Sequence, residues 1–310
     1  LWLADRAAIG LGIWWINPEL TTGLAVWGLP LEEMVFFLLT NVFVAFGLTL
    51  ALTPASLERA RALLGLARRV PPWAAVFALW ALSMIPAPLV PAAFPVLLYA
   101  GTVFLALGVL LYALERYGRR AWLLFGVALG FGLLVEWLGE ASGVPFGRYS
   151  YTAPGPQLLG VPLFVPLGWW AFTMIALAVP SPAPRRARLV LAPLALVAWD
   201  LGLDPLMVQQ GLWRFESPGV LYGVPLSNFV GWWAAGFVLV ALLSALEPRL
   251  LRDEAPALRL VYLLEAFLLG VGLVSFGLPV AGLLAALAMF SLALPPLLAR
   301  RPPKLARQDA

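Results

Sequence analysis

Two pairs of acidic residues with the same spacing are the strongest candidates for chemistry in this sequence. Glu136 and Glu140 form one pair, and Asp200 and Asp204 form the other. Residues at i and i+4 share a helix face, so each pair would place two carboxyl groups side by side. Adjacent carboxyl groups resist ionising together, and the member that keeps its proton can act as a general acid.

Other catalytic chemistries are restricted by composition. The sequence contains no histidine and no cysteine. This excludes disulfides, Cys/His zinc sites and every Ser-His or Cys-His mechanism. Carboxyl groups therefore remain as the strong acid–base candidates.

The acids lie in a very apolar chain. Of 310 residues, 62% are hydrophobic and 12% are charged, with a mean hydropathy of +0.92, whereas soluble domains are roughly 45–50% apolar and about 25% charged. We expect an all-α, polytopic integral membrane helical bundle with about ten transmembrane helices. The expected spans are 1–16, 30–52, 73–90, 92–113, 121–141, 164–180, 189–208, 229–246, 258–276 and 279–299.

Basic residues occur in every second loop. Seventeen of the 20 Lys and Arg residues fall in five segments: 53–72, 114–120, 181–188, 247–259 and the C-terminal tail. The positive-inside rule predicts that these loops and the C-terminus are cytoplasmic in a multi-pass cell-membrane protein. The basic surplus is thus explained by topology, without a nucleic-acid partner.

An internal repeat organises the chain. Residues 160–170 and 223–233 are identical at seven of eleven positions, beginning with Gly-Val-Pro-Leu and ending with Gly-Trp-Trp. A diverged copy opens the chain, with Asp5 at the acid position and Gly-Leu-Pro-Leu at 28–31. Each copy reads as a helix, an acid, an aromatic loop, a Gly-hydrophobic-Pro-Leu turn and a second helix, with the proline at a helix start.

Combined with the topology, the repeat predicts that acids from several helices converge on one layer near the non-cytoplasmic face. Glu32 and Glu33, at the start of span 30–52, belong to this layer. An acid within a membrane span is costly and usually functional. The structural alternative is that Arg6, Arg148 or Arg214 neutralises the acids. Glu265, which has no equivalent in the repeat, is expected to be structural.

Aromatic and amide side chains next to the acids are candidate substrate ligands. Their rings could stabilise a carbocation, or they could form the usual interfacial aromatic belt. Gln157 is a further, weaker candidate for binding water or a hydroxyl group. The principal candidates are Trp14, Trp15, Tyr149, Tyr151, Trp213 and Asn228.

Two stretches resemble known families. Residues 12–19, Thr21-Thr22-Gly23 and 28–37, with Pro-Leu-Glu-Glu-x-x-Phe-Phe, resemble the small membrane lycopene cyclase domain of heterodimeric bacterial, archaeal and fused fungal cyclases. Residues from roughly 75 to 295, with Pro145–Tyr151 and Trp199–Pro205, resemble the carotenoid biosynthesis membrane family that includes the hydratases. The expected regions are a cyclase-like domain at 1–60, a hydratase-like domain at 70–300 and a tail at 301–310.

The resemblance implies a reaction and its catalytic residues. A buried carboxylic acid would protonate the terminal double bond of lycopene or a related linear carotenoid. Attack by an internal double bond would then give a β-ring, and attack by water a tertiary alcohol. In the cyclase family the Pro-Leu-Glu-Glu acids are thought to be catalytic, which maps to Glu32 and Glu33. The full set of candidate catalytic residues is Glu32, Glu33, Glu136, Glu140, Asp200 and Asp204.

The resemblance also bears on cofactors and partners. It implies no metal, and the sequence has no dinucleotide-binding glycine motif, so no cofactor is expected. The expected partners are the carotenoid and membrane lipid. Cyclases of this type also normally need two such domains, and only one is visible in this sequence. The other half would lie upstream of Leu1 or in another chain, including a homo-oligomer, or the C-terminal repeats would replace it.

We rank a lycopene β-cyclase first and a carotenoid hydratase second, with a bifunctional fusion also open. A prenyltransferase would use Asp200 and Asp204 to hold magnesium and a diphosphate. Its cytosolic substrate does not fit acids near the outer face, and a second Asp-rich motif is missing. A carotenoid-binding protein without catalysis, in which the acids join helices, is the non-enzymatic alternative.

Overall fold

The structure is a computed structural model that describes residues 2–17, 21–52, 70–181, 183–217 and 219–294. It forms two compact units, Leu1–Val70 and Pro71–Ala310, here called the N-terminal unit and the C-terminal unit. The described residues contain ten α-helices and small two-stranded sheets, which confirms the all-α membrane class. The arginines of 53–69, Glu19 and the predicted tail 301–310 lie outside the described residues.

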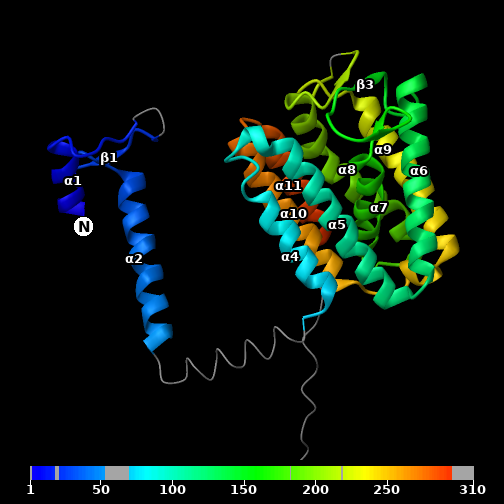
Figure 1. Ribbon diagram of the computed structural model, residues 1–310, viewed down its shortest axis with the longest axis horizontal. Helices are drawn as coiled ribbons and strands as arrows, with labels where there is room; N and C mark the ends of the chain where they lie inside the picture. Colours follow the sequence, from blue (N-terminus) through cyan, green and yellow to red (C-terminus); the bar gives the residue numbers. More distant parts are fainter. Residues whose placement is uncertain (1, 18–20, 53–69, 182, 218, 295–310) are drawn as a thin grey trace, which may run out of the picture. The chain divides into compact units, whose positions relative to one another are not determined.

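The N-terminal unit contains two helices and a hairpin (Figure 1). Helix α1 covers Trp2–Gly10, strands β1 (Ala25–Val26) and β2 (Leu29–Pro30) pair, and α2 covers Leu31–Leu52. The expected span 1–16 is wrong in length, because α1 ends in a turn with Gly12 at φ +70°. The described helix therefore ends six residues before the expected span does.

The C-terminal unit is a helical bundle. Its helices are α4 (Pro72–Met84), α5 (Phe94–Tyr117), α6 (Arg120–Ser142), α7 (Phe164–Ala178), α8 (Arg185–Gln209), α9 (Leu226–Leu246), α10 (Pro256–Ser275) and α11 (Pro279–Ala293). Two 3₁₀ turns, η2 (Pro91–Ala93) and η3 (Pro248–Leu251), join helices. The expected span 73–90 ends early, at Met84, because Pro86 and Pro88 follow it. Short helices such as α4 must therefore be stabilised by packing.

Six described helices are long and apolar enough to cross a membrane: α2, α5, α6, α8, α9 and α10. Helices α4, α7 and α11 are apolar but shorter. Helix α7 is the centre of the C-terminal unit, since nearly all of its side chains are buried and it packs against α5, α6, α8, α9 and α10 (Figure 1). The outward faces of the surrounding helices carry exposed apolar side chains, which suit contact with lipid.

All three copies of the Gly-hydrophobic-Pro-Leu turn have the same backbone shape. In each, the glycine and the residue before it have positive φ, as in the type I′ hairpin turn. The pairs are Trp27-Gly28 (φ 54°, 77°), Leu159-Gly160 (53°, 84°) and Tyr222-Gly223 (48°, 89°). Glycine adopts this conformation without a Cβ penalty. The hairpins lead into α2, α7 and α9, with Pro30 and Pro225 directly before the helix and Pro162 one residue earlier.

The two C-terminal copies of the repeat pair with each other. Strand β3 (Tyr149–Tyr151) is antiparallel to β6 (Trp213–Phe215), and the pairing is centred on Ser150 opposite Arg214. These two residues occupy the same position in their copies. In the repeat, α6 corresponds to α8, and α7 corresponds to α9. Helix α6 contacts α9, and α8 contacts α7 in the equivalent way. The two copies are therefore related by a local two-fold axis through the centre of the β3–β6 pair.

A charged cluster joins the helix ends opposite that pair. Glu247, buried after α9, accepts hydrogen bonds from the Arg249 guanidinium at 2.9 Å and pairs with Arg120 at 3.3 Å. The hydrogen bonds from Arg249 lower the pKa of Glu247 to about 2. Arg116 and Asp253 form a second ion pair at 3.3 Å. Three of the predicted basic segments thus lie at one end of this unit, since Arg188 also binds the carbonyl of Asp253.

Candidate functional site

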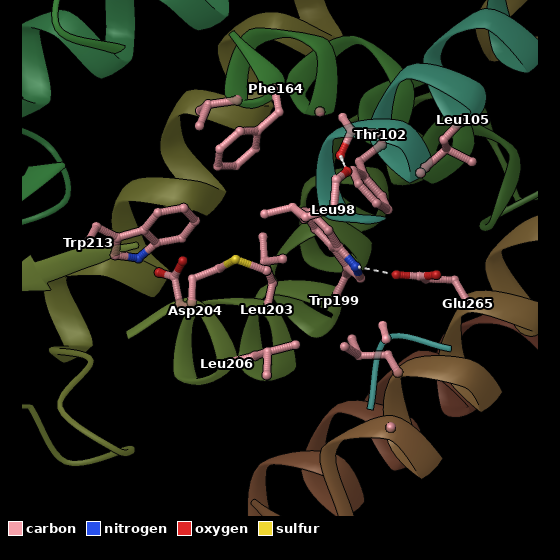
Figure 2. Close-up of a pocket in the computed structure, with 18 of the residues that line it drawn as sticks. Leu98, Thr102, Leu105, Phe164, Trp199, Leu203, Asp204, Leu206, Trp213 and Glu265 are labelled. Carbon is pink, nitrogen blue, oxygen red and sulfur yellow. Dashed lines mark hydrogen bonds between the residues drawn. The ribbon is translucent and has the colours of Figure 1, made fainter. Parts of the chain in front are cut away.

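A cavity of about 150 Å³ lies inside the C-terminal unit (Figure 2). Most of its lining is aliphatic or aromatic. An apolar cavity of this size can hold a group as large as benzene, which suits the end of a hydrocarbon chain rather than a whole carotenoid. The side chains with carboxyl, amide or hydroxyl groups in its wall are Thr102, Glu136, Tyr149, Tyr151, Asp204, Asn228 and Glu265.

Glu136 accepts three hydrogen bonds. The hydroxyls of Tyr149 and Tyr151 donate to Oε2 at 2.6 and 2.7 Å. The indole Nε1 of Trp169 donates to Oε1 at 2.7 Å. Strand β3 brings both tyrosines to α6, and α7 supplies the tryptophan. Both carboxyl oxygens therefore have hydrogen-bond partners, although the side chain is buried.

The second acid pair has a different environment. Asp200 and Asp204 lie one turn apart on α8, are buried, and are close enough to hydrogen-bond to each other. The amide Nδ2 of Asn228, from α9, donates to Asp200 at 2.9 Å and also to Asp204. Among the described residues, no arginine forms an ion pair with either acid. Two carboxyl groups in contact without a cation are most stable when they share one proton.

Aromatic rings form much of the wall between the two acid groups. Trp169 and its repeat equivalent Trp232 stack with ring centroids 4.4 Å apart. Trp199 stacks on Phe172 and meets Trp232 edge to face at 6.0 Å. The indole of Trp213 points toward the carboxyl group of Asp204 (Figure 2). Electron-rich ring faces in this position could stabilise a cation.

The structure brings together many of the predicted residues around the cavity: Glu136, Tyr149, Tyr151, Asp204, Trp213 and Asn228. Asp200, one helical turn before Asp204, is not part of the cavity lining. Glu140 is also outside the lining, and its Oε1 accepts from the backbone N–H of Tyr151 at 3.3 Å. Glu140 therefore helps to hold β3, the strand that carries the tyrosines of Glu136.

The remaining predicted residues belong to the N-terminal unit. Glu32 accepts a hydrogen bond from the backbone N–H of Thr22 at 2.5 Å, and Glu33 follows it in the first turn of α2. Trp14 donates to the buried Asp5 at 3.0 Å. This pair repeats the combination of acid and aromatic donor found in the C-terminal unit. Trp15 is 77% exposed within this unit.

Sequence reasoning missed several residues of the cavity. Trp169, in the repeated Gly-Trp-Trp segment, was not among the principal candidates, and its bond to Glu136 depends on how α6 and α7 pack. Glu265 was expected to be structural, but it lines the cavity and accepts a hydrogen bond from Trp199 at 3.1 Å. The available signal was its place in the middle of an apolar span, where a carboxyl group usually faces an interior site.

The fold and this site define an α-helical membrane protein whose interior contains acids around a small apolar cavity. Comparison with known proteins identifies the family: the carotenoid biosynthesis protein profile matches residues 93–292. Because the match covers more than half of the sequence, the chain belongs to this family. It is a protein of carotenoid biosynthesis.

Two kinds of curated enzyme are similar to the chain. A bisanhydrobacterioruberin hydratase of Haloarcula japonica is 34% identical over 161 residues, covering 49% of this chain and 55% of the hydratase. A lycopene beta-cyclase of Halobacterium salinarum is 57% identical over 47 residues, 15% of this chain and 20% of the cyclase. A bifunctional lycopene cyclase/phytoene synthase of Leptosphaeria maculans is 48% identical over 48 residues, 15% of this chain and 8% of that enzyme. The chain thus spans about half of the hydratase and a smaller part of each cyclase. No solved structure matches it.

Proposed function

We propose that this chain protonates the terminal double bond of a linear carotenoid of the lycopene type, and that its C-terminal unit then adds water. The observation that carries this proposal is the pairing of two unlike acid groups in one apolar cavity. Asp204, with Asp200 and Asn228, is suited to hold a proton. Glu136, with three donors, is suited to remain charged.

The proposed reaction begins with the Asp204 proton. The π electrons of the terminal double bond form a C–H bond with that proton, which leaves a tertiary cation on the neighbouring carbon. The negative charge of Glu136 and the ring faces of Trp169 and Trp232 stabilise this cation. The oxygen of a water molecule bonds to the cation and loses one proton to a carboxylate, giving a tertiary alcohol without a change in redox state.

The roles of the other acids follow from their positions. Asp200, one helical turn before Asp204, shares the proton and helps to restore it after each turnover. Asn228 orients both carboxyl groups. Glu140 holds β3 through the backbone of Tyr151 and acts as a positioning residue.

The test is to express the full chain in a lycopene-accumulating bacterium and to identify the pigments by chromatography and mass spectrometry. We expect products that have gained water, and we expect Asp204→Asn to lower their yield by about a hundredfold, as for loss of a general acid. Glu216→Gln, an exposed acid outside the cavity, is the matched control. Full hydration by Asp204→Asn would overturn this assignment.

A second candidate function is β-ring formation by the N-terminal unit. The short, highly identical match to lycopene cyclases supports it, together with the position of Glu32 and Glu33 directly after a hairpin of the repeat. This activity requires a second half-site from another cyclase half or another copy of the chain. The Glu32→Gln, Glu33→Gln double variant should abolish any product of unchanged mass with a β-ring spectrum, and should leave hydration intact. Ring formation by this variant would refute the second candidate.

A further inference from the structure

Glu265 is a carboxyl group that the reaction described so far does not use. It lies near the middle of α10, about 14–15 Å of helix from either end. Its Oε1 accepts from Nε1 of Trp199 at 3.1 Å. Within the described part of the chain, no cation pairs with Glu265 and no donor meets its other oxygen. A carboxyl group with an open hydrogen-bonding position is costly in an apolar cavity, so a polar ligand is needed to complete the site.

Glu265 and Asp204 face the cavity from different sides. Figure 2 shows Asp204 on α8 beside Trp213, and Glu265 on α10 across the pocket, with Trp199 and Leu203 between them. An end group that receives a proton from Asp204 would therefore present another side of the cation to Glu265. The bond to Trp199 holds one carboxylate oxygen and leaves the other available to the cavity.

We propose that Glu265 binds the water molecule that attacks the cation and accepts its proton. This inference rests on the proposed hydration reaction and assigns the base that the reaction needs. The water oxygen forms the new C–O bond while one of its O–H bonds breaks, and that proton passes to the open oxygen of Glu265. Glu265 then releases a proton and the Asp200–Asp204 pair takes one up, so the enzyme returns to its starting state.

Glu136 is a poorer candidate for this base. Both of its oxygens already accept hydrogen bonds from Tyr149, Tyr151 and Trp169. Accepting a proton would oppose these donors, whereas Glu265 has one donor and one open oxygen. The two carboxylates therefore have different roles: Glu136 stabilises the cation, and Glu265 activates the water molecule.

The test measures protonation and water capture separately. Membranes that contain the full chain or a variant are incubated with unlabelled lycopene in deuterated water, so that deuterium can enter the carotenoid only after its synthesis. Deuterium in the recovered lycopene shows that a carbon atom gained a proton and that the resulting cation then lost one. The hydrated product shows that water attacked the cation. We expect Glu265→Gln to lower the hydrated product by about a hundredfold while deuterium incorporation persists or rises, because the cation still forms but is not captured.

A second variant distinguishes base chemistry from packing. Glu265→Ala removes the carboxyl group, and added formate, a small carboxylate, should restore part of the hydration. Glu216→Gln with and without formate is the control. Persistent deuterium incorporation, lost hydration and rescue by formate together support the inference.

Other outcomes are equally decisive. Wild-type hydration by Glu265→Gln overturns the role of Glu265 and leaves the proposed function intact. Loss of both deuterium incorporation and hydration in that variant also overturns it, because the residue would then be needed before water arrives. If the wild-type chain produces neither readout, the proposed function fails and the inference fails with it.

Discussion

The carboxyl groups of the cavity differ in their hydrogen-bond donors, and the proposed reaction assigns them different charges on this basis. Glu136 meets two tyrosine hydroxyls and an indole, whereas Asp200 and Asp204 meet each other, one amide and, at Asp204, the Trp213 indole. Each bond from a neutral donor to a charged acceptor is worth roughly 1.5–3 kcal/mol. Several such bonds offset part of the cost of burying the Glu136 carboxylate in an apolar interior.

This argument predicts the effect of removing one hydroxyl. Tyr151→Phe keeps the ring and deletes the donor to Glu136, so the carboxylate should stabilise a cation less well. We expect hydration to fall by about tenfold or more, in line with a charge-assisted bond. The measurement is product yield per unit of protein in lycopene-accumulating cells. Tyr222→Phe, in a hairpin turn outside the cavity, is the control, and an equal yield from both variants would contradict the role of Tyr151.

At the scale of elements, the repeat could be predicted from the sequence, but the way its copies meet could not. Seven identical positions in eleven, including the turn glycine and proline, were enough to expect a common turn at 160 and 223. The β3–β6 pairing depends on contacts between residues more than 60 positions apart, for which local sequence has no signal. The two-fold relation between the copies therefore emerged only in the structure.

The site was predictable to a similar extent. The i,i+4 spacing correctly grouped Glu136 with Glu140 on one helix, but it could not tell which of them faces the cavity. That depends on strand β3. The backbone N–H of Tyr151 donates a hydrogen bond to Glu140, whereas the tyrosine hydroxyls of the strand donate to Glu136. Glu265 has no repeat equivalent and comes to the cavity through the packing of α10 on α8. Acids in apolar spans were thus recognisable as candidates, and their separate roles were not.

The charged cluster after α9 predicts a pH-dependent contribution to stability. The pKa of Glu247 is lowered from 4.5 to about 2, so its ionised form binds Arg249 and Arg120 in the folded state. A lowered carboxyl pKa stabilises the fold above the unfolded value, and this contribution is lost as pH falls through the folded value. Glu247→Gln should therefore lower the Tm by a few degrees at neutral pH, and its deficit should shrink between about pH 4.5 and pH 2.

The measurement is the thermal unfolding of the full chain in detergent over this pH range. Glu115→Gln, an exposed acid at the same end of the bundle, is the control for general charge effects. A Tm deficit of Glu247→Gln that stays constant as the pH is lowered would show that packing, rather than the ionised carboxylate, explains the loss.

At the scale of the whole molecule, the chain combines one copy of the repeat in the N-terminal unit with two in the C-terminal unit. The C-terminal copies pair with each other, and their helices line one cavity together with α4, α5 and α10. The N-terminal unit has the hairpin, the acid and its aromatic donor from a single copy. On this basis we propose hydration for the C-terminal unit, whereas ring formation by the N-terminal unit would require a second half-site.

The distribution of charge predicts how the C-terminal unit lies in the membrane. Arg116, Arg120, Arg188 and Arg249 meet at one end of the bundle through their bonds to the 247–254 segment, and the β3–β6 pair lies at the opposite ends of the same helices. The positive-inside rule predicts that the arginine end faces the cytoplasm. The acids would then lie in the outer half of α6 and α8, close to the non-cytoplasmic face.

Single cysteines can test this orientation without background, because the sequence contains no cysteine. Val220 is 90% exposed in the loop before α9, and Arg119 is exposed between α5 and α6 at the arginine end. We expect Val220→Cys to react with a membrane-impermeant maleimide in intact cells, and Arg119→Cys to react only after the cells are permeabilised. Labelling of the cysteine-free parent is the control for specificity. The reverse pattern would place the acids near the cytoplasm, where a diphosphate substrate could reach Asp200 and Asp204, and would reopen the prenyltransferase alternative.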